Sequence, residues 1–366
     1  MLLLGAWLHD LSPFALRFTD DFGLRWYGLS YAAGFVVAYF ILRALAVRRL
    51  IDIPHDRIAD AMTWLILGVV GGGRLGYILF YDPSLLTSFS SSFPFWGVFA
   101  LSQGGMASHG GMVGVILACW FISRGFRTES NALVGRTSTL HVMDCMALAA
   151  TPGLFFGRIA NFVNGELLGK IVAMPGQAAP WWTVRFPQEL LARPMSEGGH
   201  RPDLTPAQSA ALDALVRAHA LPSDDFRSAT GRMLTLLQSG PDATRSRLAA
   251  ELAPLVSARH PSQLYQAVAE GLVLGLVLLW FWRAPRAPGL VAACFLILYG
   301  VLRVLTEFIR LPDEQLAVQT FAGLSRGQWL SLVMVAAGAL LARASVVRSR
   351  RFSPPLKLGG WGARAS

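Results

Sequence analysis

Long apolar runs dominate this sequence, and they limit what the chain can fold into more than any other feature. Seven runs approach or exceed the length needed to cross the ~30 Å hydrocarbon core of a bilayer as helices. They are residues 26–46, 59–80, 105–122, 140–163, 265–282, 289–309 and 328–346. Only 15% of the 366 residues are charged, whereas soluble domains carry about 25%. The sequence therefore predicts an all-α polytopic membrane protein with about seven transmembrane helices.

The positions of Lys and Arg between the runs predict the orientation, because cytoplasmic loops carry an excess of basic residues. Arginines occur in loops 47–58 and 123–139, in turn 283–288 and in the tail after residue 346, whereas loop 81–104 has no Lys or Arg. We therefore expect the N-terminus outside and the C-terminus in the cytoplasm. The net charge of +10 then lies mainly on one side of the bilayer and does not indicate nucleic-acid binding.

This topology divides the chain into four parts: helices 1–4 with an external N-terminal arm (1–170), an extracytoplasmic segment (171–259), helices 5–7 (260–346) and a basic cytoplasmic tail (347–366). Within the second part, residues 195–258 have the composition of a soluble insertion. Thr205 and Pro206 predict a helix start there, as N-cap and first helical residue. The stretches 207–220 and 242–258 are amphipathic. Alternatively, the insertion is a family-specific addition that takes no part in the reaction.

Three arginines lie near the external ends of the second, fourth and sixth predicted helices. Arg74, Arg158 and Arg303 each precede the end of an apolar run by five or six residues, which is roughly 8–9 Å at the rise of an α-helix. Ionisable groups at such a depth are costly and mark functional sites. A guanidinium grips phosphate oxygens with a planar fork. Because phospholipid headgroups supply phosphate at this level, we expect a phospholipid site.

Two of these arginines have polar residues on the same helix face, which form a polar stripe along each helix. Arg303 has Tyr299 four residues before it and Glu307 four residues after it, and Arg158 has Asn161 three residues after it. Such spacings place side chains on one face, so we expect both stripes to face the bundle interior. A structural Arg303–Glu307 pair and snorkelling of single arginines to the interface remain alternatives.

Two further segments enter the membrane from outside. His109 lies in residues 103–112, where glycines allow close backbone approach and the imidazole can accept a proton near neutral pH. Residues 259–266 precede the fifth helix and contain His260, Ser262 and Gln263. His109 can also be a hydrogen-bonded interface residue, and the second group can cap its helix instead of lining a site.

The remaining composition excludes several kinds of protein. Cys119, Cys145 and Cys294 all fall inside apolar runs, so we expect buried thiols without a disulfide framework or metal-ligand spacing. The first ten residues lack a basic region and a cleavage site, so we expect no signal peptide. A transporter or lipid-binding protein with an anion site remains a second class, although no repeat between the two halves supports it.

The ordered set of motifs resembles the bacterial prolipoprotein diacylglyceryl transferase family. Any single motif is weak, whereas the set occurs in the family's order, covers most of the chain and is specific. The matching segments are Trp26 to Leu29, Gly72 to Tyr77, Gly104 to Met106, His109 to Gly111, Gly157 to Leu167, His260 to Tyr265, Tyr299-Gly300, Arg303, Glu307-Phe308, Arg310, Pro312-Asp313 and Gly327-Gln328. The chain departs from the family in the longer segment between Met195 and Ala258, and at Gln103 and Ser108.

The resemblance implies transfer of the diacylglyceryl group of phosphatidylglycerol to the thiol of a lipobox cysteine in a prolipoprotein signal peptide. The products are a thioether and glycerol 1-phosphate. The family also implies a multi-pass protein of the bacterial inner membrane with its active site towards the periplasm. No metal, nucleotide or other cofactor is expected, and the partners are the lipid, the prolipoprotein and the bilayer.

The resemblance also implies which residues act. Arg158 and Arg303 are expected to hold the departing phosphate and His109 to take the thiol proton, with Glu166 or a phosphate oxygen as alternative acceptors. The remaining expected site residues position the headgroup or support the arginines. They are Tyr27, Arg74, Asn161, Asn164, Glu166, His260, Gln263, Tyr299 and Glu307.

Overall fold

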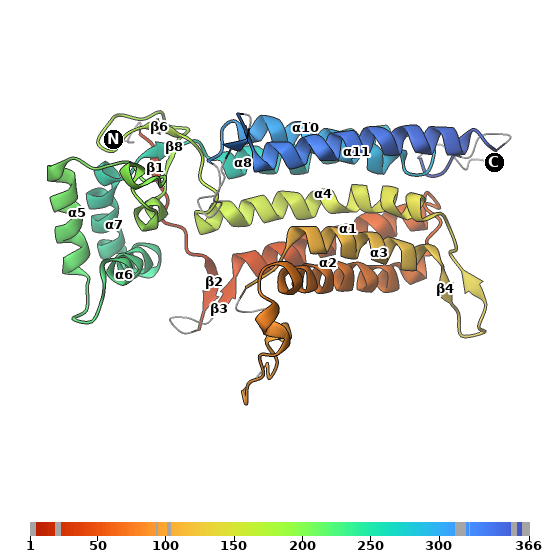
Figure 1. Ribbon diagram of the computed structural model, residues 1–366, viewed down its shortest axis with the longest axis horizontal. Helices are drawn as coiled ribbons and strands as arrows, with labels where there is room; N and C mark the ends of the chain where they lie inside the picture. The colour runs from red at the N-terminus through yellow and green to blue at the C-terminus, as the bar shows by residue number, and fades with distance from the viewer. Residues whose placement is uncertain are drawn as a thin grey trace. The chain divides into compact units, whose positions relative to one another are not determined.

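A computed structural model describes residues 5–18, 23–92, 94–100, 104–311, 320–321, 323–352 and 357–360. Six helices within these residues are long and apolar enough to cross a membrane. They are Trp26–Val47, His55–Phe80, Thr139–Asn164, Ser262–Phe281, Leu290–Glu307 and Gly327–Ser349. The chain is therefore a mostly helical, multi-pass membrane protein (Figure 1). Gln103 and the Pro312-Asp313 pair lie outside the described residues.

The third predicted span is shorter than the sequence suggested. It forms α3, Ser108–Ser123, with 16 residues, which is about 24 Å at the α-helical rise. The difference arises at its beginning, because Gly104 and Gly105 adopt left-handed backbone angles with φ of 85° and 82°. These angles keep residues 104–107 out of the helix.

The chain separates into two compact units. Unit 1 comprises Met1–Ala32, Leu154–Val273 and Tyr299–Val333. Unit 2 comprises Ala33–Gly153, Leu274–Leu298 and Met334–Ser366. Most of the long helices contribute a segment to each unit.

Small residues bring two helices of unit 2 together. Helix α2, Ile58–Phe80, lies beside α3 in the opposite direction (Figure 1). Gly72 and Gly76 of α2 face Gly110 of α3, and a Cβ atom at Gly76 would lie 2.7 Å from the Gly110 Cα. Such small-residue contacts drive helix packing in membranes. The glycine after His109 is therefore required for close helix packing.

A buried carboxylate fixes the start of another helix in unit 2. Asp144, on α4 (Thr139–Asn164), is 2% exposed. It accepts hydrogen bonds from the backbone nitrogens of Gly289 at 2.7 Å and Ala292 at 2.8 Å, at the beginning of α10 (Leu290–Glu307). The first N–H groups of a helix lack partners within the helix. Asp144 supplies partners for two of them from a different helix.

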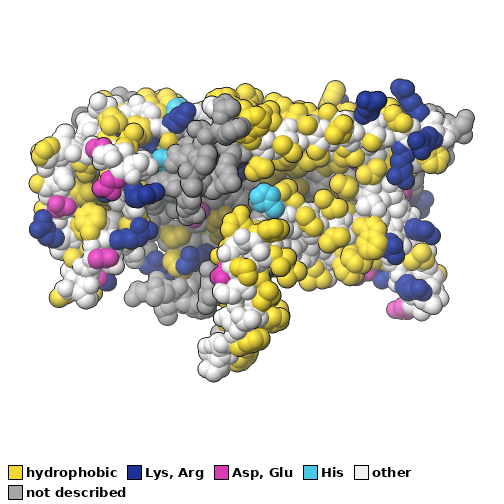
Figure 2. Space-filling view, viewed as in Figure 1, with side chains coloured by type: hydrophobic (Ala, Val, Ile, Leu, Met, Phe, Trp, Pro, Cys, Tyr) yellow, Lys and Arg dark blue, Asp and Glu magenta, His cyan; other side chains and the backbone are white. Residues whose placement is uncertain are grey.

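Charge is distributed unevenly over unit 2 on the face shown in Figure 2. Hydrophobic side chains cover its helices, whereas Lys and Arg gather at the end that carries the hairpin of β4 (Phe126–Arg127) and β5 (Leu133–Val134) and the end of α11 (Arg326–Ser349). The first long helix along the chain is α1, Trp26–Val47. An apolar belt with a basic border is what a membrane-spanning chain requires.

Three helices of the insertion pack together in unit 1. They are α5 (Pro206–Ala218), α6 (Phe226–Ser239) and α7 (Asp242–Leu252) (Figure 1). Thr205 and Gln208 form a complete capping box at α5, which confirms the predicted helix start. Helix α6, capped by Asp225, was not predicted. The shared core consists of Leu8, Leu190, Leu212, Val216, Ala229, Met233, Leu237, Leu248, Leu252, Leu255 and Val256.

A small sheet of unit 1 joins this insertion to the fifth predicted span. Its strands are β1 (Trp7–Leu8), β7 (Val184–Arg185), β8 (Ala258–Arg259) and β6 (Ile171–Ala173), in that order. Only the β1–β7 pair of this sheet is parallel. We call helices α5–α7, this sheet and the 3₁₀ turn Pro187–Leu191 the head. Because β8 ends three residues before α8 begins, the head is coupled directly to that helix.

The fifth span itself is not one regular helix. It consists of α8 (Ser262–Gln266), a π-helical segment η8 (Ala267–Val273) and α9 (Leu274–Phe281). Gly271 lets the π segment approach α4 closely, since a Cβ atom there would lie 2.6 Å from the Phe155 Cβ. Single π turns occur frequently at functional sites, and this one carries Glu270.

The remaining elements are short. Two hairpins pair β2 (Phe14–Arg17) with β3 (Gly23–Arg25) and β9 (Thr320–Phe321) with β10 (Leu324–Ser325). Single 3₁₀ turns lie at His55–Arg57, Pro83–Leu86, Gly97–Phe99, Pro187–Leu191, Met195–Glu197 and Ala253–Leu255.

Candidate active site

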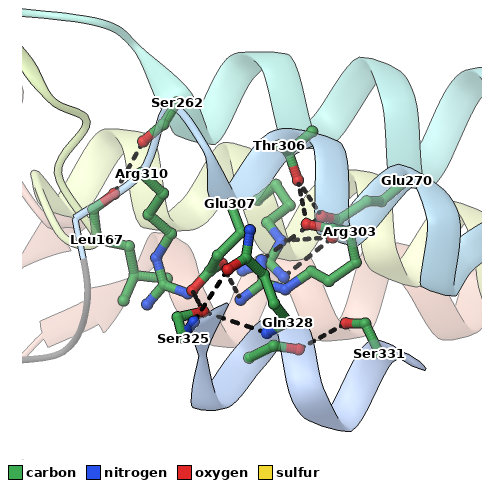
Figure 3. Close-up of polar contacts among 12 residues, drawn as sticks. Leu167, Ser262, Glu270, Arg303, Thr306, Glu307, Arg310, Ser325, Gln328 and Ser331 are labelled. Atoms are coloured by element: carbon green, nitrogen blue, oxygen red, sulfur yellow. Dashed lines mark hydrogen bonds and ion pairs between the residues drawn. The ribbon is translucent and has the colours of Figure 1, made fainter. Parts of the chain in front are cut away.

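Glu270 is the centre of a buried ionic cluster in unit 1. Its side chain is fully buried and its Oε2 accepts hydrogen bonds from Arg158 Nε at 3.3 Å and Nη2 at 3.0 Å. Its Oε1 accepts a hydrogen bond from the Thr306 hydroxyl at 3.0 Å and lies 3.5 Å from Arg303 Nη1 (Figure 3). The two arginines expected to share a phosphate therefore converge on one carboxylate.

A second carboxylate extends the cluster along α10. Glu307 Oε2 lies 3.3 Å from Arg303 Nη2 and 3.5 Å from Arg310 Nη1. Its other oxygen accepts a hydrogen bond from the Ser325 hydroxyl at 3.2 Å (Figure 3). A Cβ atom at Gly327 would lie 2.9 Å from this carboxylate. The predicted Arg303–Glu307 pair is thus present, as part of a larger network.

Two arginines of this network keep some contact with solvent. Among the described residues, ion pairs join the guanidinium groups of Arg158, Arg303 and Arg310 to the carboxylates of Glu270 and Glu307. The Arg158 side chain is 16% exposed and that of Arg303 is 13% exposed. An anion that reaches these two guanidinium groups would find donors suited to its oxygens.

Tyr299 lies against the same cluster. It stands on α10 one turn before Arg303 and its hydroxyl is hydrogen-bonded to Arg158. Residues of α4, the π segment and α10 therefore surround Glu270. The sequence predicted the face of α10 but not the contribution of the π segment.

A polar group at the end of α4 brings together four expected site residues. Asn161 Nδ2 donates hydrogen bonds to the Tyr27 hydroxyl at 3.3 Å and to Glu166 Oε2 at 3.4 Å. Asn164 Nδ2 donates to Glu166 Oε1 at 3.2 Å. The Glu166 carboxylate is therefore held by two amides, one of which also contacts Tyr27.

The start of α8 is bound to the segment that follows α4. The Gln263 amide donates a hydrogen bond to the Glu166 carbonyl, and the Ser262 hydroxyl donates to the Leu167 carbonyl at 3.0 Å (Figure 3). Helix α8 has no side-chain cap. The alternative that Ser262 and Gln263 cap this helix is therefore wrong, because both side chains bond to another segment.

His260 lies at the surface of the head, just before α8. Its ring lies 5.3 Å from the Trp182 ring and 6.1 Å from the Tyr265 ring. Partial burial lowers the pKa of His260. An apolar, aromatic environment of this kind favours the neutral imidazole, and a role in substrate binding remains a prediction.

Arg74 of unit 2 binds backbone carbonyls. It is 5% exposed and donates hydrogen bonds to the carbonyls of Gly97, Val98, Gly104 and Gly105, the last three at 2.9, 2.7 and 3.0 Å. This guanidinium therefore fixes the loop that leads into α3. Its expected part in substrate binding stays a prediction.

His109 lies in the first turn of α3, and its side chain is exposed. An exposed imidazole can exchange protons with solvent or substrate. Its expected role as the base stays a prediction.

Glu270 is a candidate site residue that was not predicted from the sequence. It lies inside an apolar run, and a carboxylate at such a depth is as costly as an arginine, so its position was a signal that could have identified it. Thr306 has no comparable signal, since hydroxyl groups occur in apolar helices without an ionic partner.

Fold and site together define a multi-pass membrane protein with a buried, arginine-rich polar cluster. A family model described as prolipoprotein diacylglyceryl transferase matches residues 13–343. The phosphatidylglycerol–prolipoprotein diacylglyceryl transferase of Bdellovibrio bacteriovorus is 39% identical over 363 residues, covering 97% of both chains. Those of Ruegeria pomeroyi and Neisseria gonorrhoeae are both 36% identical, covering 90% of this chain and 93% and 94% of theirs. The chain belongs to the prolipoprotein diacylglyceryl transferase family and is a transferase.

Proposed function

We propose that this protein transfers the diacylglyceryl group of phosphatidylglycerol to the lipobox cysteine of prolipoproteins and releases glycerol 1-phosphate. The observation that carries the proposal is the convergence of Arg158 and Arg303 on one carboxylate, that of Glu270. The names of the relatives, which match 90% or more of this chain, support the same substrates.

The reaction is a displacement at an sp³ carbon of the lipid glycerol. The thiolate sulfur forms the new C–S bond, the C–O bond to the phosphate breaks, and its electron pair leaves with the phosphate oxygen. Negative charge then develops on the leaving group. Arg158 and Arg303 hold these oxygens and stabilise the charge as it develops, while Tyr299 and Glu307 orient the two guanidinium groups.

The polar group at the end of α4 positions the rest of the donor. Tyr27, Asn161, Asn164 and Glu166 offer hydroxyl, amide and carboxylate groups, which match the hydroxyl groups of the glycerol headgroup. Gln263 and His260, at the start of α8, support this polar group, and Arg74 supports the loop before α3.

The thiol must lose its proton, because the thiolate is the nucleophile. His109 is the proposed acceptor, and the Glu166 carboxylate or a phosphate oxygen is the alternative. The proton then leaves with the phosphate product or passes to solvent, so the overall reaction neither consumes nor releases a redox equivalent.

The distribution of arginines supports a location in the bacterial cytoplasmic membrane with the site towards the periplasm. In this arrangement the segment 171–259 is periplasmic and the tail 347–366 is cytoplasmic. Helices 1–4 in residues 1–170 and helices 5–7 in residues 260–346 form the membrane part.

A transfer assay with purified protein, phosphatidylglycerol and a lipobox peptide tests the proposal. Arg158→Ala and Arg303→Ala are each expected to lower kcat by about 10²- to 10³-fold, as for loss of a donor to a developing oxyanion. Arg217→Ala, at a head arginine that is 79% exposed, is the control and keeps turnover. Near-normal turnover of both site variants would overturn the arginine clamp.

The pH dependence of the same assay tests the base. If His109 accepts the proton, His109→Gln lowers kcat and changes the shape of the pH–rate profile. An unchanged profile in the variant would exclude His109 and leave Glu166 or a phosphate oxygen as the acceptor.

A further inference from the structure

The two arginines proposed to hold the substrate phosphate are already bridged by a carboxylate of the protein. We propose that Glu270 is an internal competitor of the phosphate group, which leaves the arginines when phosphatidylglycerol binds and returns to expel glycerol 1-phosphate. This inference rests on the proposed function and adds a role in product release to it.

The geometry supports competition because a carboxylate and a phosphate use the same donors. Arg158 offers Nε and Nη2, one edge of its planar fork, to Glu270 Oε2. That edge is one of those that grip two oxygens of a phosphate. Arg303 directs Nη1 to Glu270 and Nη2 to Glu307. A phosphate that takes both arginines by these edges must displace Glu270.

The charge of the ligand explains why a competitor is useful. The phosphodiester of phosphatidylglycerol carries one negative charge, whereas a phosphate monoester carries about 1.5 to 2 at neutral pH. Attraction to fixed guanidinium groups rises with the charge of the ligand. Arginines without a competitor would therefore hold the product more tightly than the substrate, and release would limit turnover.

The surroundings of Glu270 allow the carboxylate to move. It belongs to a π-helical segment, whose i→i+5 turns are uncommon and occur as local irregularities of an α-helix. Thr306 donates to Glu270 Oε1 at 3.0 Å and also lies 3.3 Å from the Arg303 carbonyl. When the carboxylate leaves, the hydroxyl therefore retains a partner.

A purely structural bridge would behave differently from a competitor. Removing the charge of a structural bridge disorders the arginines and weakens every phosphate ligand. Removing the charge of a competitor frees the same donors and strengthens the binding of phosphate ligands. The two roles therefore predict opposite changes in the affinity for phosphate ligands.

The experiment compares product inhibition by glycerol 1-phosphate in the wild type and in Glu270→Gln, using the transfer assay. The competitor role predicts that the inhibition constant falls by about tenfold, the worth of one hydrogen bond between charged groups. It also predicts that kcat and the KM for phosphatidylglycerol both fall, because release becomes slower. An inhibition constant that is unchanged or raised overturns the inference.

Glu189→Gln is the matched control, since it makes the same change at a buried, arginine-bound carboxylate in the head. Its inhibition constant is expected to equal that of the wild type. Arg158→Ala and Arg303→Ala separate the two proposals. If they retain turnover, the proposed clamp fails; if they lose it while Glu270→Gln leaves the inhibition constant unchanged, only the competitor fails.

A second variant covers the case in which Glu270→Gln does not fold. Thr306→Val removes a hydrogen bond that holds the same carboxylate and keeps the shape of the side chain. The competitor role predicts a lower inhibition constant for glycerol 1-phosphate in this variant as well, whereas Thr306→Ser keeps the wild-type value. A raised or unchanged constant in Thr306→Val counts against the inference.

Discussion

Unit 1 contains two buried arginine–carboxylate clusters that share a chemistry and differ in how completely they are satisfied. In the head, Arg259 and Glu189 are 0% and 1% exposed, and Arg259 Nε donates to Glu189 Oε2 at 2.7 Å. Arg259 also donates to the carbonyls of Gly169 at 3.2 Å and His200 at 2.7 Å. These carbonyls occupy the other nitrogens of Arg259, and the buried Arg185 lies near enough to Glu189 to interact with its charge.

The Glu270 cluster is partly open. Both Arg158 and Arg303 keep some exposure, at 16% and 13%. A closed cluster holds segments of the head together, whereas a partly open cluster leaves guanidinium groups within reach of an anion. Exposure, and not the presence of an ion pair, distinguishes a structural arginine from a candidate ligand.

The largest effect is expected for loss of the head carboxylate. Glu189→Ala leaves the fully buried Arg259 without a counter-charge and should lower the free energy of unfolding by about 3–5 kcal/mol. Glu270→Ala should lower it by about 1–3 kcal/mol, because Arg303 keeps its ion pair with Glu307 and both arginines keep some solvent contact. Denaturant unfolding of the two purified variants in detergent measures the difference. Equal losses of unfolding free energy in the two variants would contradict this difference between the clusters.

A matched pair of hydroxyl groups sharpens the comparison with a smaller effect. Ser257 donates from its backbone and its hydroxyl to Glu189, as Thr306 donates to Glu270. Ser257→Ala is expected to lower the free energy of unfolding by about 1 kcal/mol without changing kcat. Thr306→Val is expected to change the inhibition by product more than the stability. Unfolding and transfer assays measure both effects. A change of product inhibition in Ser257→Ala, with only a loss of stability in Thr306→Val, would contradict this distinction.

The smallest effect concerns a buried histidine beside the head pair. His9 is fully buried, with Nε2 2.8 Å from the Phe162 carbonyl and Nδ1 3.2 Å from the Gln188 amide nitrogen. Burial lowers the pKa of His9. The unfolded chain then binds the proton more readily, so the stabilising contribution is complete above about pH 6.5 and is lost as the pH falls through the folded-state pKa.

Thermal unfolding at pH 7.5 and pH 5.5 measures this effect. The wild type is expected to lose more stability on acidification than His9→Gln, which keeps an amide donor and acceptor but does not titrate. A loss of the same size in both proteins would mean that other groups carry the pH dependence.

The sequence predicted the membrane class and the main polar face of the site. Apolar runs define spanning helices because lipid leaves the backbone no other partner, and the positions of Arg74, Arg158 and Arg303 predicted a shared depth for the three arginines. The depth of Glu270 in its apolar run was a comparable signal, but nothing in the sequence indicated that its carboxylate joins Arg158 to Arg303. The π-helical segment that carries Glu270 leaves no periodic signal in the sequence.

Contacts distant in sequence were beyond prediction. Glu189 and Arg259 are separated by 70 positions, and polar residues in an insertion give no indication of their partners. Helix α6 was also missed, because the amphipathic pattern was assigned only to the helices on either side of it. The head core and its buried pair depend on tertiary packing, which overrides local preference.

Thermal unfolding of the purified protein with and without glycerol 1-phosphate tests most directly whether the Glu270 cluster is the phosphate site. A ligand that binds only the folded state raises its stability in proportion to RT ln(1 + [L]/Kd). Glycerol 1-phosphate is expected to raise the Tm of the wild type and of Glu189→Gln but not that of Arg158→Ala or Arg303→Ala. An equal rise in Tm in all four proteins would contradict it.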